Sequence, residues 1–340
     1  MKLINSSVEI IPQEAGLQGV YKQIEKCGRT CYKSTDKITE DSAKPFVDRM
    51  IASDHTAMLE QSAVYLKVPR DDFNRIVDDH DFAFWDNPYS YFNGVDYPGY
   101  MCISTNLRVL YEHHYMQLLD FVVDPSEEEF RKKVWQRRVT VRFICDRGVS
   151  HELVRHRVLS FAQESTRYCN YNKNKFGNEL TFIIPTWLQL NTGHYEFINN
   201  ESGIPAIAGD GFLKDVSYVQ NPNNFDKETE FLALLCNAEN TYMSLINGGC
   251  ALQEARQVLP NALKTEVCVT GFVEDWKKFF ELRFFGYTGK PHPDMQKLAT
   301  ELFFKMVHIM DYAGWELDEM VKRGFSEAAA AVCNGQSAKV

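Results

Sequence analysis

The segment Arg155-His156-Arg157-Val158-Leu159-Ser160-Phe161-Ala162-Gln163-Glu164-Ser165-Thr166-Arg167-Tyr168 holds the densest collection of chemically active side chains in the sequence. Arginine offers a planar fork of donors that suits phosphates and the edges of heterocycles, and neighbouring hydroxyl groups complete what a phosphate pocket needs. The plain alternative is a solvated basic surface. Because apolar residues such as Val158, Leu159 and Phe161 interrupt the polar ones, the segment must pack partly against a core. An arginine-rich segment held on a core is typical of a binding site.

The composition of the whole chain limits the classes of protein to consider. Its 340 residues are 44% hydrophobic and 24% charged, as in an ordinary globular protein of one large or two smaller domains. The longest apolar runs, such as 231–236, are far shorter than the ~20 residues of a membrane helix, and the first residues lack the apolar core of a signal peptide. A formal net charge of −9 argues against a protein whose main partner is nucleic acid, but leaves room for a small anion in a local basic pocket.

Cysteines and simple motifs narrow the chemistry further. Nine scattered cysteines, no Cys-x-x-Cys pair and no export signal predict reduced thiols in a cytoplasmic protein. The stretch from His151 to His156 resembles the zinc signature His-Glu-x-x-His, but its second histidine comes one residue too late to share a helix face with the first. We therefore expect no metal site. Since no Gly-x-Gly-x-x-Gly stretch occurs, any flavin is not held by a Rossmann fingerprint.

Helical and strand periodicities are interleaved along the chain and predict the mixed α+β class. Strands are expected over 8–11, 62–68, 139–144 and 182–185. Helices are expected over about 20–31, 39–52, 105–122, 227–247, 274–282 and 294–310. Two stretches rich in Asn, Gly and Pro, 81–100 and 191–224, are predicted to be loops, and 148–155 a turn.

Four motifs together resemble those of the flavin-dependent thymidylate synthases, the ThyX family. Arg155-His156-Arg157, seven residues and then Ser165 match that family's signature Arg-His-Arg-x7-Ser. His55–Glu60 resembles its early His-x-x-x-x-Glu segment. Ala255–Pro260 resembles its Ala-Arg-x-x-Leu-Pro segment, and Phe279–Arg283 its Phe-x-x-Leu-Arg segment. The four motifs also occur in the family's order.

The resemblance implies a fold, an assembly and a reaction. The fold is a ThyX-type α+β catalytic domain over 1–320, with insertions at about 69–138 and 191–224 and a tail over 321–340. The assembly is a homotetramer whose active sites are shared between subunits. The reaction is the methylation of dUMP to dTMP, in which methylenetetrahydrofolate gives the carbon and FAD, reduced by NADPH, gives the hydride.

The family's site residues carry over to the matching positions of this chain. The implied FAD contacts are His55, Arg155, His156, Arg157, Gln163 and Lys278. The implied dUMP contacts are Glu152, Arg155, Gln163, Ser165, Arg167, Arg283 and, from a neighbouring subunit, Arg256. Arg283 is also the implied catalytic residue, since an arginine stays charged at any working pH and can stabilise an ionised pyrimidine ring without titrating.

Four positions depart from the family pattern. Phe272 and Glu274 stand where the family usually has Asn and Arg, Lys278 where it often has Asn, and Ala162 where the signature usually has Asn. Several of these positions help to hold FAD in the family, so we expect its adenine end to be bound differently here. Two other functions remain open: a non-catalytic nucleotide- or RNA-binding module, and a flavoenzyme of the same fold that acts on another pyrimidine nucleotide. The acidic balance and the lack of a basic stripe disfavour the first.

Overall fold

The computed structural model describes residues 1–77, 84, 86–94, 97–173, 177–199, 205–209, 211–215 and 226–310, so the predicted tail over 321–340 lies outside the described residues. The chain divides into two compact units. The first comprises 1–7, 144–153 and 164–266, and the second comprises 8–143, 154–163 and the chain from 267 onward. Both contain helices and strands, which confirms the mixed α+β class. The single catalytic domain with its insertions stays a prediction.

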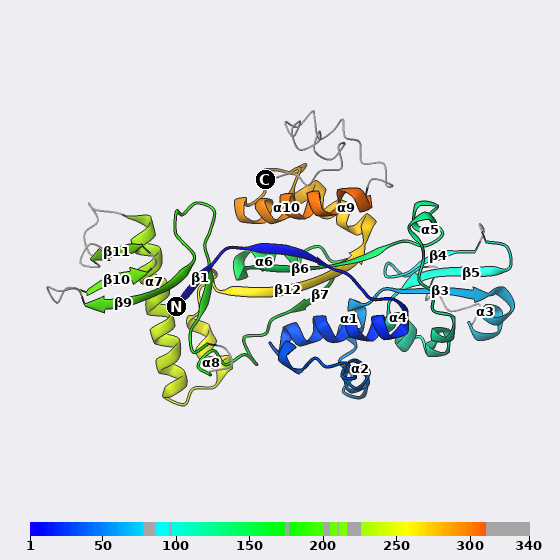
Figure 1. Cartoon of the computed structure of the whole chain (residues 1–340), viewed down its shortest axis with the longest axis horizontal. Coiled ribbons are helices and arrows are strands. Elements are labelled where there is room, and N and C mark those ends of the chain that lie inside the picture. The colour runs from blue at the N-terminus through cyan, green and yellow to red at the C-terminus, as the bar shows by residue number, and fades with distance from the viewer. Residues whose placement is uncertain are drawn as a thin grey trace. The chain divides into compact units, whose positions relative to one another are not determined.

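A five-stranded sheet in the order β11-β10-β9-β1-β8 organises the first unit. Its strands are β1 (Lys2–Ile4), β8 (Thr181–Ile183), β9 (Gly193–Asn199), β10 (Pro205–Gly209) and β11 (Phe212–Asp215). β1 pairs parallel with β8 and antiparallel with β9, and β9, β10 and β11 form an antiparallel meander. Helix α7 (Lys227–Asn247) packs against β9 and β10 (Figure 1). The short helices α6 (Arg147–Leu153) and α8 (Leu252–Ala255) also belong to this unit.

The meander corrects the prediction of a loop over 191–224. Tyr195 of β9 and Ile207 of β10 are buried in one cluster with Leu232 and Leu235 of α7, so the strands cover an apolar helix face. Gly211 adopts a φ of 77° between β10 and β11, a conformation that glycine allows at little cost. Among the described residues of this stretch, Gly193, Pro205 and Gly209 lie at strand ends, although such residues were read from the sequence as a continuous loop.

Two sheets organise the second unit. One has the order β2-β6-β12-β7 and the other β3-β5-β4. The first sheet contains β2 (Ser7–Ile11), β6 (Arg138–Asp146), β7 (Ser160–Gln163) and β12 (Lys264–Phe272), of which Ser7, 144–146 and 264–266 are assigned to the first unit. The second contains β3 (Val64–Pro69), β4 (Tyr91–Asn93) and β5 (Tyr100–Thr105).

Seven α-helices accompany these sheets in the described part of the second unit. They are α1 (Gly16–Cys31), α2 (Ala43–Ala52), α3 (Arg70–Ile76), α4 (Leu107–Glu112), α5 (Glu127–Arg131), α9 (Val273–Arg283) and α10 (Pro293–Met310). α1 packs against α2, and α9 lies beside α10 (Figure 1). Among the helices described here and in the first unit, none combines the length and the apolar character needed to cross a membrane.

The sequence analysis missed β5 and β12 and took α6 for a turn. β12 is buried along almost its whole length, and its sequence Lys-Thr-Glu-Val-Cys-Val-Thr-Gly-Phe mixes charged, hydroxyl and apolar residues without clear alternation. Its buried Thr270 is satisfied by the side chains of Thr140 and Gln61, at 2.8 and 2.9 Å. α6 forms because the Asp146 carboxylate accepts a hydrogen bond from the amide of Val149 at 2.8 Å and so caps a helix start.

The predicted helix over 105–122 breaks into two pieces. Asn106 caps the start of α4 by accepting from the amide of Val109 at 3.1 Å. The helix then stops because His114 takes a φ of 62°, and the amides of His114 and Tyr115 donate to the carbonyls of Tyr111 and Leu110. This Schellman arrangement turns the chain out of the helix. A 3-10 helix, Met116–Phe121, follows.

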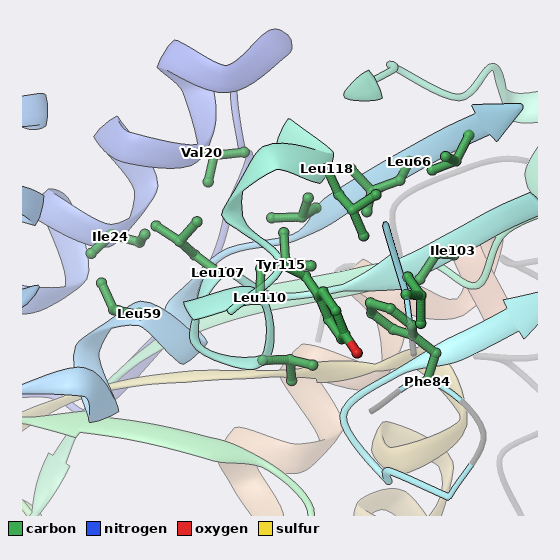
Figure 2. Packing of buried hydrophobic residues seen from close by; sticks show 14 of the residues in the cluster. Val20, Ile24, Leu59, Leu66, Phe84, Ile103, Leu107, Leu110, Tyr115 and Leu118 are labelled. Carbon is green, nitrogen blue, oxygen red and sulfur yellow. The ribbon is translucent and has the colours of Figure 1, made fainter. Parts of the chain in front are cut away.

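One large buried cluster of the second unit joins α1, α2, α4, β3 and β5. Figure 2 shows side chains from α1, α4, β3 and β5, and from the 3-10 helix Thr56–Gln61, packed together. Those labelled in the figure are Val20, Ile24, Leu59, Leu66, Phe84, Ile103, Leu107, Leu110, Tyr115 and Leu118. Much of the predicted insertion over 69–138 therefore shares a core with the N-terminal helices.

Leu110→Ala should destabilise the protein strongly, because Leu110 is fully buried in this cluster. Such truncations cost about 2–5 kcal/mol of unfolding free energy. The control is Leu234→Ala, the same change on α7 at a leucine that is 57% exposed, which should cost under about 0.5 kcal/mol. Urea unfolding of both variants checks this. Equal losses in the two would contradict the assigned core.

Candidate active site

The signature segment places its arginines on exposed turns next to a buried strand. Arg155 and Arg157 are exposed, and the amide of Leu159 donates to the carbonyl of His156 at 3.0 Å. Leu159 is buried, and it packs so closely on Gly271 that a Cβ atom there would lie 2.2 Å from its Cδ2 atom. β7 follows directly and pairs antiparallel with β12. The turn is therefore anchored through Leu159 and β7, while its cationic side chains reach solvent.

Helix α9 brings Arg283 to His156. Its apolar residues Trp276, Phe279 and Phe280 are fully buried, and Arg283 is the last residue of the helix. The Nε of Arg283 donates to Nε2 of His156 at 3.1 Å. The Phe279 ring packs edge-on against the imidazole, with centroids 5.1 Å apart. Two predicted site residues that are 127 positions apart in the sequence are thus in direct contact.

His156 is neutral at physiological pH. Burial lowers its pKa, and the positive charges of Arg283 and Lys278 lower it further, to about 4. Because a guanidinium can only donate, Nε2 of His156 must be the acceptor, and the ring proton is assigned to Nδ1. The influence of both cations on one imidazole also reveals a positive potential here, which suits an anionic ligand.

Arg155, Arg157, Gln163 and Lys278, four other predicted flavin contacts of the second unit, carry groups of the kind that bind a diphosphate. Arg155, Arg157 and Lys278 are exposed cations, and Gln163 is half-buried on β7. Guanidinium and ammonium groups are the side chains that bind phosphate most strongly. This donor set, together with the positive potential at His156, is what an anionic dinucleotide requires.

Two of the positions that depart from the family pattern have structural roles. Phe272 is buried, with the guanidinium of Arg138 4.9 Å from its ring, and its amide donates to the Asp275 carboxylate at 2.9 Å. Phe272 is therefore the N-cap residue of α9. Glu274 pairs with Lys277 at 2.8 Å on the same helix. Burial raises the pKa of Asp275 to about 6.

His55 is placed by the end of α2. The chain leaves this helix through Asp54, which has a φ of 58°, and the amides of Asp54 and His55 donate to the carbonyls of Ile51 and Met50 at 3.1 and 2.8 Å. This Schellman motif fixes the backbone of His55, whose side chain is exposed. A contact between His55 and the flavin stays a prediction.

The first unit carries the remaining predicted site residues. Glu152 is half-buried on α6. Ser165 begins a turn in which its Oγ accepts from the amide of Arg167 at 3.3 Å and its carbonyl from the amide of Tyr168 at 3.2 Å. Arg167 is exposed, as is Arg256, which follows α8. Their convergence on one nucleotide stays a prediction.

Glu164 and Lys264 were not among the site residues predicted from the sequence, and they form a buried ion pair at 2.9 Å in the first unit. Glu164 directly precedes the signature serine. The available signal was an acidic residue in that place and a lysine at the start of a stretch that mixes polar and apolar residues, and such patterns usually indicate a surface position.

A comparison with family models matches the C-terminal half of the chain. Residues 135–310, slightly more than half of the chain, match the family described as "Thymidylate synthase complementing protein". This range includes all the predicted site residues from Glu152 to Arg283. His55 lies outside it.

Curated relatives align over a similar region. A flavin-dependent thymidylate synthase of Pyrococcus furiosus is 27% identical over 139 residues, which make up 41% of this chain and 43% of the relative. One of Corynebacterium efficiens is 31% identical over 137 residues, 40% of this chain and 45% of the relative. The chain thus spans less than half the length of these relatives.

The similarity to solved structures is weaker. Crystal structures of the UMP/dUMP methylase PolB from Streptomyces cacaoi, bound with 5-Br dUMP and with 5-Br UMP, are 13% identical to this chain, with TM-scores of 0.39 and 0.40. The first alignment covers 91% of this chain and 93% of that one, and the second 96% and 98%. Likeness at this level transfers neither the fold nor the ligands of those structures.

The neutral His156 predicts an acid-sensitive contribution to stability. Its folded pKa of about 4 lies below the ordinary 6.5, so between these values the unfolded chain binds the proton more readily than the folded chain. The contribution is complete above about pH 6.5 and is lost as the pH falls toward 4. Because glutamine keeps an acceptor but does not titrate, the melting temperature of His156→Gln should fall less steeply over this window than that of the wild type. Parallel curves of melting temperature against pH would contradict the assigned state.

Proposed function

We propose that this chain, which belongs to the thymidylate synthase complementing protein family of flavin-dependent thymidylate synthases, methylates dUMP to dTMP. Methylenetetrahydrofolate provides the carbon, and FAD, once bound and reduced by NADPH, provides the hydride. The observation that carries the proposal is the hydrogen bond from Arg283 to His156, because it joins two of the family's motifs in one contact.

Arg283 is assigned to the pyrimidine ring. C5 of uracil is a poor nucleophile until negative charge on the ring is stabilised, and a preorganised cationic donor supplies that stabilisation. His156 fixes the guanidinium plane through Nε and, being neutral, does so without cancelling its charge. The terminal nitrogens are then the donors that we assign to the ring.

The remaining side chains are assigned to binding. Arg155, His156, Arg157, Gln163, Lys278 and His55 hold FAD. Glu152, Arg155, Gln163, Ser165 and Arg167 hold dUMP, together with Arg256 of a neighbouring subunit. A dianionic phosphate needs local cations in a chain of net charge −9, and the exposed Arg167 and Arg256 can supply them. An active site shared within a homotetramer accounts for arginines that are exposed in the single chain.

Turnover tests the proposal as a whole. The purified protein should carry or take up FAD, which gives it a yellow colour. It should form dTMP only when dUMP, methylenetetrahydrofolate, NADPH and FAD are all present. Protein that binds no FAD in a titration and forms no dTMP would sink the proposal. Binding of RNA by such a colourless protein would favour the non-catalytic alternative.

Removing Arg283 should slow the nucleotide half of the reaction while leaving flavin reduction intact. Loss of one preorganised charge-stabilising donor typically costs ~10²–10³ in rate. Arg283→Lys should be nearly as slow as Arg283→Ala, because an ammonium cannot replace a fork of donors. The measurements are FAD content, NADPH-driven flavin reduction and dTMP formation. The control is Arg75→Ala, at an arginine whose side chain is 74% exposed. Near-normal dTMP formation by folded Arg283→Ala would remove this residue from the mechanism.

Mixed subunits should test the shared site. Arg256→Ala and Arg167→Ala each remove one cation assigned to the phosphate, so each variant alone should form dTMP poorly. If the two arginines of a site come from different subunits, some sites in a mixed tetramer keep both, and mixing should restore part of the activity. Light scattering should report a tetramer. A fully active monomer would refute the shared site.

A further inference from the structure

A buried network fixes the residue directly before Ser165. Glu164 is 2% exposed. Its Oε1 accepts from the Tyr171 hydroxyl at 2.9 Å, and its Oε2 accepts from Nζ of Lys264 at 2.9 Å. Its amide donates to the carbonyl of Glu266 at 2.8 Å. Glu164 is thus held through its backbone and through both carboxylate oxygens.

Lys264 and Tyr171 are each in the protonation state that these bonds require. Lys264 is 7% exposed and also donates to the carboxylate of Glu266. Burial alone would lower the pKa of Lys264, but the charges of Glu164 and Glu266 outweigh burial and raise it, so the lysine stays charged. Burial and the charge of Glu164 raise the pKa of Tyr171, whose hydroxyl therefore keeps the proton that it donates.

The network brackets a short exposed turn. The carbonyl of Ser165 accepts from the amides of Tyr168 and Cys169 at 3.2 and 3.1 Å, and its Oγ accepts from the amide of Arg167. Arg167 and Tyr168 are exposed, whereas Cys169 and Tyr171 are buried. The residues before and after the exposed turn are therefore held in place by the buried network.

We propose that Glu164 and Lys264 are positioning residues for the nucleotide, which hold the turn that presents Ser165 and Arg167 to its phosphate. This rests on the proposed function, since that function assigns Ser165 and Arg167 to dUMP. The pair acts through the turn and does not touch the nucleotide.

A stabilising role alone does not account for an ion pair at this place. Desolvation of two charges offsets much of their attraction, and well-packed apolar residues of similar size are often at least as stabilising. A buried network whose polar groups are all hydrogen-bonded instead fixes the orientation of the backbone and side chains that take part in it. A binding group must be held within about 0.5 Å of its productive geometry, and an apolar pair gives a turn no such restraint.

The test removes both charges together, because replacing Lys264 alone would leave the Glu164 carboxylate buried without its cation. The central variant is Glu164→Leu/Lys264→Met. Glu164→Gln is the conservative variant, since it keeps the side-chain length and an acceptor for Tyr171. The matched control is Glu25→Leu/Arg29→Met, which removes another buried ion pair, at 2.6 Å in α1.

Three readouts are compared with the wild type: the dissociation constant for dUMP, the affinity for FAD, and amide hydrogen exchange in the turn. In the central variant, dUMP should bind about 10- to 100-fold more weakly, as expected when binding groups are misplaced. The amides of Tyr168 and Cys169 should exchange faster, while FAD affinity and NADPH-driven flavin reduction stay unchanged. Glu164→Gln should lie between the wild type and the central variant, and the control should match the wild type.

If the central variant binds dUMP as tightly as the wild type, or if its turn exchanges amide hydrogens at the wild-type rate, the proposal is overturned. An equal loss of FAD and dUMP binding would also overturn it, because that result shows a general effect on folding. A wild-type protein that binds FAD but no dUMP would instead sink the proposed function. Amide hydrogen exchange, measured without nucleotide, would then decide whether Glu164 and Lys264 hold the turn.

Discussion

The hydrogen bond from Arg283 to His156 requires a neutral imidazole, and the chemistry that we assign to Arg283 depends on that bond. Burial keeps His156 neutral, and the nearby cations reinforce the effect by lowering its pKa further. A protonated histidine would offer Arg283 a like charge and no acceptor at Nε2. The imidazole thus orients the guanidinium and leaves its full charge available. The buried aromatic face of α9, with Phe279 against the imidazole, in turn holds both partners.

Each unit uses the same physical arrangement for its predicted site residues. In the second unit, buried Leu159 and the aromatic face of α9 lie next in sequence to exposed or half-buried cations. In the first unit, buried Glu164 and Tyr171 flank the exposed turn that carries Arg167. Such rigid buried supports let charged side chains face solvent and still keep their direction, which is what binding of phosphate groups demands. The two supports differ: the second unit uses apolar and aromatic packing, whereas the first unit uses a buried ion pair with its hydrogen bonds.

Sequence reasoning succeeded where one periodicity or one motif dominates. The 3.6-residue spacing of α7, α9 and α10 and the alternation in β3 each reflect one buried face, so those elements were found. β12 was missed because burial on both faces, with polar groups satisfied by distant side chains, leaves no periodicity to detect. The motifs identified the candidate site residues, and the contact between His156 and Arg283 required the fold. Glu164 and Lys264 could not be recognised from composition, because only the fold buries a lysine beside a glutamate.

The most direct measurement of the central claim is a histidine-selective ¹⁵N NMR titration, with the His156 signal identified by its loss in His156→Gln. We expect His156 to titrate near pH 4 and to have, at neutral pH, an unprotonated Nε2 that accepts a hydrogen bond. In Arg283→Ala that bond should vanish while the pKa rises only part of the way to 6.5, since burial is the larger cause. A His156 that titrates near 6.5 in the wild-type protein, or carries its neutral proton on Nε2, would contradict the account.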